Sequence, residues 1–116
     1  MTHNYDELRL SIACEEGDLE KVKSLIGKGL DIDLEYKFWT PLTKASEKGH
    51  SDIVEYLVEN GAGVNIKNED GHTALILVSN EDKEHLNIIQ YLVDNGADIN
   101  IKNNDGDTAL IIASKK

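Results

Sequence analysis

Residues 60–75 read NGAGVNIKNEDGHTAL, and residues 95–110 read NGADINIKNNDGDTAL. The two stretches differ only at the paired positions 63/98, 64/99, 69/104 and 72/107. A degraded copy comes earlier, as KGLDID at 28–33 and TPL at 40–42. A stretch that recurs at intervals of 32 and 35 residues indicates an array of stacked repeats, because each unit buries its apolar face only against a neighbour.

Each full copy ends one helix and begins the next. Gly61 and Gly96 follow apolar residues at helical spacing, and glycine just past such a pattern predicts a helix C-terminus. The Asp-Gly pair that follows each of them predicts a tight turn. Thr73 and Thr108 come next and are candidate N-caps, whose hydroxyl groups accept from a free backbone N–H. Each copy therefore predicts a helix end, a hairpin-like finger and a helix start.

These blocks resemble the ankyrin repeat, and the likeness covers nearly the whole chain, from roughly residue 6 onward. It is carried by GADIN at 96–100, DGDTAL at 105–110, Thr40-Pro41-Leu42 and Gly49-His50. The resemblance implies an all-α ankyrin-repeat solenoid of helix-turn-helix units with fingers, with about three repeats and a terminal half-repeat. The family histidine after Thr-Pro-Leu is replaced here by Thr43, Ile76 and Ile111. The resemblance therefore predicts no histidine network between repeats and a greater dependence on apolar contact.

The chain is expected to form a single domain over residues 4–116, with repeats at roughly 5–35, 36–68, 69–103 and 104–116. The first helix is expected over 6–16, with Asp6 as its N-cap. Its apolar face is expected to contain Leu8, Leu10, Ile12 and Ala13.

The last repeat stops after one helix, at about Ser114. Leu110, Ile111 and Ile112 then lack a second helix to cover them. We expect end-to-end self-association or fraying there, because exposed apolar patches usually mark contacts. Two explanations stay open: a fragment of a longer array, or a half-repeat that is the whole C-terminal cap.

The composition bears on compartment and partners. The chain carries a net charge of −10, and its sequence has no block of Lys or Arg except the terminal Lys115-Lys116. Neither nucleic acid nor an anionic membrane is therefore expected as a partner, whereas a basic or neutral protein surface is. No apolar run reaches the roughly 18 residues of a membrane span, and the start shows no signal-peptide pattern. With a single cysteine, an intracellular, cytoplasmic protein is expected.

No catalytic, cofactor-binding or metal-ligating constellation is recognisable. The Gly27/Gly29 and Gly61/Gly63 pairs echo a dinucleotide fingerprint. That motif needs a strand before it and a helix after it, whereas these pairs follow helix ends. They are better explained as helix C-terminal signals.

His50, His85 and Cys14 each have a simpler explanation than a catalytic or metal site. His50 matches the structural Gly-His turn of the ankyrin pattern, and most motif residues outside a convergent site are structural. Cys14 lies on an apolar helix face with no histidine spaced to activate it, so a buried, inert thiol is expected. His85 lies near Glu81 and Asp82, but a charged loop of this kind is usually solvated and no second histidine pair supports a metal site.

The resemblance implies that the partner-binding positions are the residue before the Thr, the finger tip and the end of the first helix. In this chain those positions form a mostly acidic face with one aromatic end: Lys37, Trp39, Glu47, Lys48, Glu69, Asp70, His72, Asn80, Glu81, Asp105 and Asp107. The aromatic first finger adds Tyr36 and Phe38 as candidate partner-binding residues.

The first finger departs from the repeat pattern. It is one residue shorter than the others, and Tyr36-Lys37-Phe38-Trp39 replaces the Asp-Gly turn on a finger that should face solvent. A tight turn without glycine must find another geometry. One interpretation is a binding hot spot, since Trp and Tyr dominate interface energetics. The other is that Phe38 and Trp39 fold back onto a neighbouring finger or the helix that starts at Pro41.

Asn65 and Asn100 lie at the bases of the two regular fingers. The simpler interpretation is that their side chains bond the backbone of their own finger, as Asn does in turns. The resemblance adds an alternative, because this position is a hydroxylation site in ankyrin repeats of eukaryotes.

The sequence thus predicts a non-catalytic protein–protein interaction module that binds its partner on the concave face of fingers and inner helices. One alternative is an N-terminal or excised segment of a larger multi-domain protein, which positions another activity. A second alternative is an enzyme of unknown type, against which the lack of convergent acid, base or nucleophile speaks.

Overall fold

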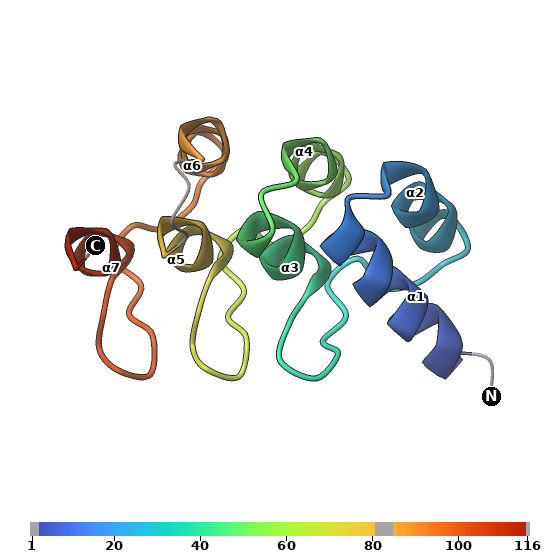
Figure 1. Ribbon diagram of the computed structural model, residues 1–116, viewed down its shortest axis with the longest axis horizontal. Coiled ribbons are helices and arrows are strands. Elements are labelled where there is room, and N and C mark those ends of the chain that lie inside the picture. Colours follow the sequence, from blue (N-terminus) through green and yellow to red (C-terminus); the bar gives the residue numbers. More distant parts are fainter. Residues whose placement is uncertain (1–2, 81–84, 116) are drawn as a thin grey trace.

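The computed structural model of this chain describes residues 3–80 and 85–115, which contain seven helices. They are α1 His3–Glu16, α2 Leu19–Gly27, α3 Pro41–Glu47, α4 Ser51–Glu59, α5 Ala74–Ser79, α6 Leu86–Asp94 and α7 Ala109–Ser114. Figure 1 shows two layers, with α1, α3, α5 and α7 in an inner layer and α2, α4 and α6 in an outer one. The predicted all-α solenoid is confirmed, and it measures 42 × 25 × 23 Å.

Three fingers descend from the inner layer (Figure 1). We name them finger 1 (residues 33–40), finger 2 (residues 65–73) and finger 3 (residues 100–108). The inner helices stack directly on one another, since α1 contacts α3, α3 contacts α5 and α5 contacts α7. The fingers and the inner helices therefore share one side of the array.

The threonines start the inner helices as predicted. Thr73 Oγ1 accepts from Ile76 N at 3.2 Å, and Thr108 Oγ1 accepts from Ile111 N at 3.4 Å. Thr40 and Thr43 form a reciprocal capping box, with Thr43 N donating to Thr40 Oγ1 and Thr40 N donating to Thr43 Oγ1 at 2.7 Å. These bonds satisfy amides that the first helical turn leaves free.

The core is a continuous apolar seam between the two layers. Its largest buried side chains include Leu10, Leu42, Ile53, Leu57, Ile76, Ile88 and Leu92. The hydrogen bonds of the Thr43 side chain all stay within its own repeat, on Thr40. At the other two positions where the family has its histidine, Ile76 is buried in the seam, whereas Ile111 is 40% exposed.

Helix α1 differs from the prediction. It begins at His3 rather than at residue 6, so Asp6 lies inside the helix and not at its N-cap. The Asp6 carboxylate instead lies 3.3 Å from Arg9 Nη1 and 3.8 Å from Lys28 Nζ.

The apolar face of α1 is also narrower than expected. Leu10, Ala13 and Cys14 are buried, whereas Leu8 and Ile12 are 42% and 46% exposed. Residues two apart lie on different sides of a helix. Leu8 and Ile12 therefore cannot face the core together with Leu10.

His50 links the first two repeats. Its Nε2 donates to the backbone carbonyl of Glu15 at 2.8 Å. A Cβ at Gly17 would lie 2.8 Å from the same imidazole ring, so only glycine lets the ring approach this closely. The predicted structural role of His50 is confirmed.

None of the helices in residues 3–80 and 85–115 combines the length and the apolar character that crossing a bilayer requires.

Candidate functional site

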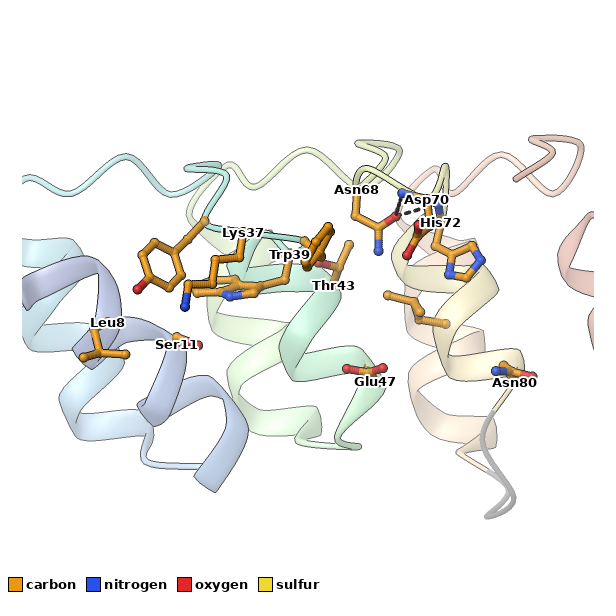
Figure 2. A pocket seen from close by; sticks show the side chains of 13 residues that line it. Leu8, Ser11, Lys37, Trp39, Thr43, Glu47, Asn68, Asp70, His72 and Asn80 are labelled. Carbon is orange, nitrogen blue, oxygen red and sulfur yellow. Dashed lines mark hydrogen bonds between the residues drawn. The ribbon is translucent and has the colours of Figure 1, made fainter. Parts of the chain in front are cut away.

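Finger 2 is closed by a three-residue turn. Asn68 N donates to His72 O at 2.9 Å, and Gly71 N donates to Asn68 O at 3.0 Å. Figure 2 shows the Asn68 side chain inside the turn, where Oδ1 accepts from Asp70 N and His72 N at 2.9 Å each. Gly71 has a φ of 79°, which is the left-handed conformation that such a turn requires of its last residue. The predicted Asp-Gly turn is confirmed.

Finger 3 repeats this construction. Asn103 Oδ1 accepts from the backbone N of Asp105 and of Asp107 at 2.9 Å each. The asparagine that holds each finger is therefore Asn68 or Asn103, and not Asn65 or Asn100 as predicted. Both asparagines recur in the sequence at equal spacing, so the repeat alone could not say which one enters the turn.

Asn65 performs a different task. Its Oδ1 accepts from Asp98 N at 2.7 Å, and its Nδ2 donates to Gly96 O at 3.1 Å. Both partners belong to the next repeat. Asn65 thus joins two repeats at the base of the fingers, which corrects the expectation that it bonds its own finger.

Finger 1 has a different turn. Tyr36 N donates to Trp39 O at 3.0 Å and Trp39 N donates to Tyr36 O at 3.2 Å, which leaves only Lys37 and Phe38 in the turn. Lys37 has a φ of 58°, and within the described part of the chain it is the one non-glycine residue with a positive φ. A lysine thus occupies the left-handed conformation that glycine occupies in fingers 2 and 3, which is unfavourable for a residue with a side chain.

The aromatic residues of finger 1 divide between core and surface. Trp39 is 7% exposed, and its ring meets that of Tyr36 edge to face, with centroids 5.6 Å apart. Phe38 is 61% exposed. The Lys37 ammonium lies 5.5 Å from the centroid of the Tyr36 ring. Of the two interpretations of this finger, the fold-back onto the core therefore holds for Trp39, which lies in the apolar seam, and does not hold for Phe38.

A groove of about 430 Å³ lies along the inner helices beside fingers 1 and 2. We call it the finger groove, and Figure 2 shows its lining from α1, α3, α5 and the two fingers. It brings together many of the residues predicted as a binding site: Tyr36, Lys37, Phe38, Trp39, Glu47, Asp70, His72 and Asn80.

Other predicted residues lie elsewhere. Lys48, Glu69, Asp105 and Asp107 do not line the finger groove. Asp107 is held by Lys115, whose Nζ lies 2.9 Å from its Oδ2. Glu81 lies outside the residues that the structure describes.

The groove also has lining residues that sequence reasoning missed: Leu8, Ser11, Thr43, Asn68 and Leu77. Asn68 could have been found, because its recurrence as Asn103 before each Asp-Gly pair is a turn signal. Leu8 could not, because it was assigned to the core face of α1. Leu8 is exposed because α1 packs with Leu10, Ala13 and Cys14 toward the core.

The tips of fingers 2 and 3 are bonded to each other. Asn104 N donates to Asp70 O at 3.0 Å, and Asn104 Nδ2 donates to Glu69 O at 2.9 Å. Finger 1 is bonded to the following repeat only at its base, where Asp33 Oδ1 accepts from Gly63 N at 2.9 Å. No hydrogen bond among the described residues joins the tip of finger 1 to finger 2. The tips of fingers 1 and 2 both line the finger groove.

The charges around the groove are unevenly paired. Lys44 Nζ lies 3.9 Å from Glu15 Oε1 and 3.8 Å from Glu47 Oε1. In contrast, the carboxylates of Glu69 and Asp70 have no ion-pair partner within the described ranges. The tip of finger 2 thus presents unpaired negative charge.

Cys14 offers no nucleophile. It is fully buried, and this burial raises the pKa of its thiol to about 12, although Lys44 acts in the opposite direction. The thiol therefore stays protonated at neutral pH, as the expected inert residue would. Among residues 3–80 and 85–115 no group of three or more His, Cys, Asp or Glu side chains could hold a metal ion.

The far end of the array carries an apolar surface. Leu110 is 78% exposed and Ile111 is 40% exposed. A second groove of about 400 Å³ opens there between α5, α6, finger 3 and α7, and apolar side chains such as Ile89, Val93 and Ile99 line it.

Comparison with known proteins gives a consistent result. The family described as ankyrin repeats (3 copies) matches residues 10–103 and 60–116. The human ankyrin repeat and KH domain-containing protein 1 is 40% identical over 74 residues, which are 64% of this chain and 3% of that protein. The mouse ankyrin repeat and SAM domain-containing protein 6 is 37% identical over 71 residues, 60% of this chain and 8% of that protein. The chain thus spans less than a tenth of these curated relatives.

Proposed function

The chain belongs to the ankyrin-repeat family, and from that premise we propose that it is a non-catalytic interaction module whose partner protein binds in the finger groove. Members of this family generally bind other proteins and are generally not catalytic. An intracellular, cytoplasmic setting is part of the proposal, since the single cysteine is a buried thiol.

One observation carries the proposal: Phe38 lines the finger groove and is 61% exposed, on a turn that holds Lys37 in an unfavourable conformation. A strained turn persists only where the surrounding structure holds it, and such turns concentrate at functional sites. A large aromatic side chain in solvent gains free energy when a partner covers it. The buried Trp39 side chain packs against Tyr36 under the turn, and we propose that it positions the turn that carries Phe38.

Around Phe38, the proposed contact surface includes polar and charged groups from two repeats: Tyr36, Lys37, Glu47, Asp70, His72 and Asn80. This arrangement matches the anatomy of interfaces, in which an aromatic anchor is surrounded by a polar rim.

Photo-crosslinking tests this assignment. The photoreactive residue p-benzoylphenylalanine is placed at Phe38, or at Leu86 as a matched control, because Leu86 is 64% exposed at the start of the outer helix α6. In extract of the native source we expect a crosslinked protein with the probe at position 38 and none at position 86.

The captured protein is then purified and titrated with Phe38→Ala and Leu86→Ala. Loss of an interface anchor costs about 2 kcal/mol or more, so Phe38→Ala should weaken binding at least about 30-fold. Equal crosslinking at both positions, or unchanged affinity of Phe38→Ala, would show that the partner does not use this groove.

A second candidate function is that the chain is a segment that positions another activity. The relatives favour it, since their names include KH and SAM domains beside ankyrin repeats. The discriminating measurement is the mass of the protein in its native source, detected with an antibody against this chain. A species near 12.9 kDa argues for an isolated module, and a much larger one argues for a segment.

Self-association through the α7 surface stays a prediction. Leu110 and Ile111 would lose water contact if a second copy covered them. Light scattering measures the molecular mass of the chain and of Leu110→Ser in solution, and we expect the mass of the variant to be closer to that of a monomer. A strictly monomeric chain at high concentration, with well-protected amides in α7, contradicts association and fraying together.

A further inference from the structure

We propose, building on the binding groove assigned above, that the partner segment is extended and carries an apolar side chain opposite finger 1 and a cationic side chain three residues further along. The cationic side chain would face the tip of finger 2.

The finger 1 end of the groove suits an apolar side chain. Phe38 and Leu8 are 61% and 42% exposed and line the same groove. The face of the Tyr36 ring, where a partner cation would otherwise be attracted, already has the Lys37 ammonium at 5.5 Å from its centroid. A second cation there would meet the charge of Lys37, whereas an apolar group would cover Phe38.

The finger 2 end of the groove suits a cation. Asp70 lines the groove and Glu69 lies next to it, and neither carboxylate has an ion-pair partner in the described residues. Two cations of this region are engaged, Lys37 with the Tyr36 ring and Lys44 with two glutamates. A chain of net charge −10 also attracts basic segments over long range and repels acidic ones.

The spacing of the repeats sets the spacing of these two side chains. Packed helices lie about 8–10 Å apart, and α1, α3 and α5 each carry part of this groove. A polyproline II segment has three residues per turn and rises about 3.1 Å per residue, so side chains i and i+3 lie on one side, about 9 Å apart. A β-strand does not fit as well, because i and i+3 point to opposite faces. Aromatic-lined grooves are also the usual sites for polyproline II segments.

Trp39 provides the readout. It is the only tryptophan in the chain and it lines the groove, so its fluorescence reports occupancy. The probes are the peptides acetyl-GPLPPRPG-amide, with Leu and Arg three apart, and acetyl-GPLPRPPG-amide, which has the same composition but a spacing of two. A third peptide replaces the arginine of the first by norleucine.

We expect the first peptide to bind at least about tenfold more tightly than either of the others, which is a difference of about 1.4 kcal/mol in binding free energy. Asp70→Asn should remove the preference for arginine over norleucine. Glu59→Gln is the matched control, because Glu59 is exposed at the end of the outer helix α4, and it should leave all affinities unchanged.

Equal affinity for the two spacings, or an arginine preference that survives Asp70→Asn, overturns the inference. So does the absence of binding by all three peptides at millimolar concentration. The crosslinking at position 38 separates this failure from that of the proposed function. If a partner is crosslinked but the peptides show no preference, only the proposed spacing and charge of the partner segment are rejected. If no partner is crosslinked at position 38, the groove itself is rejected as a binding site.

Discussion

Finger 1 and finger 2 occupy equivalent places in successive repeats, yet they are built differently. Finger 2 closes with Gly71 at a φ of 79°, holds its turn with the Asn68 side chain and bonds finger 3 at its tip. Finger 1 closes with Lys37 at a φ of 58°, and within the described ranges its one hydrogen bond to the next repeat lies at its base. The loss of one residue thus converts a finger that couples repeats into one that presents an aromatic side chain beside an open groove.

The largest expected effect concerns what supports finger 1. Trp39→Ala should lower the free energy of unfolding by about 3–5 kcal/mol, the usual cost of removing a buried large aromatic. Phe38→Ala should change it by less than about 0.5 kcal/mol, because that side chain is mostly in solvent. Urea denaturation followed by circular dichroism measures both. Similar values for the two variants would show that the aromatics of finger 1 do not divide between core and surface.

The coupling of fingers 2 and 3 is tested at their glycines. Alanine at Gly71 or Gly106 should cost about 1–2 kcal/mol from the left-handed backbone alone. A Cβ at Gly71 would also lie 2.5 Å from Asn104 Oδ1 and 2.7 Å from Asn104 N, whereas a Cβ at Gly106 has no neighbour within 4 Å. Gly71→Ala should therefore cost a further 1–3 kcal/mol or so. Thermal melts that give equal losses would mean that the finger tips are not packed together.

A smaller effect is expected at the finger bases. Asn65→Ala removes the bonds to Gly96 O and Asp98 N and should cost about 1–2 kcal/mol. Asn100→Ala is the control, since no hydrogen bond of the Asn100 side chain occurs within the described residues. Its cost should stay under about 0.5 kcal/mol. Chemical denaturation of both variants would contradict the distinction if Asn100→Ala proved the more damaging.

The smallest expected change is a gain. Lys37→Gly relieves the left-handed conformation of a residue with a side chain but adds backbone entropy to the unfolded chain and removes a weak cation–π contact. We expect a net stabilisation of about 0.5 kcal/mol by differential scanning calorimetry. A destabilised Lys37→Gly would show that the lysine side chain, and not its backbone, holds the turn.

Features that depend on a few adjacent residues could be predicted from the sequence. Thr73 and Thr108 cap helices, and the Asp-Gly turns form, because their partners lie within four residues in the chain. The side of α1 that faces the core could not be predicted. Leu8, Leu10 and Ile12 alternate along the chain, and no local signal says which of them meet α3. The role of Asn65 was predicted wrongly for the same reason. Asn68 bonds within its own finger, whereas Asn65 bonds a residue 33 positions away, and no local signal distinguishes the two.

The candidate site was predictable as a set of positions but not as a shape. The repeat pattern marked Lys37, Glu47, Asp70 and Asn80 as contact positions, and these residues line one groove. The burial of Trp39 and the absence of a bond between the tips of fingers 1 and 2 depend on how the repeats stack. Those features became visible only in three dimensions.

The hydrogen bonds between repeats also bear on how the chain folds. His50 bonds Glu15, Asn65 bonds Gly96, and Asn104 bonds Asp70, so each joins only adjacent repeats. An array with nearest-neighbour coupling nucleates at one interface and propagates from it. The contact between α3 and α5 lies in the middle of this stack and is flanked on both sides. We expect folding to start there and to spread toward α1 and α7, so substitutions in α7 should speed unfolding while leaving the folding rate nearly constant.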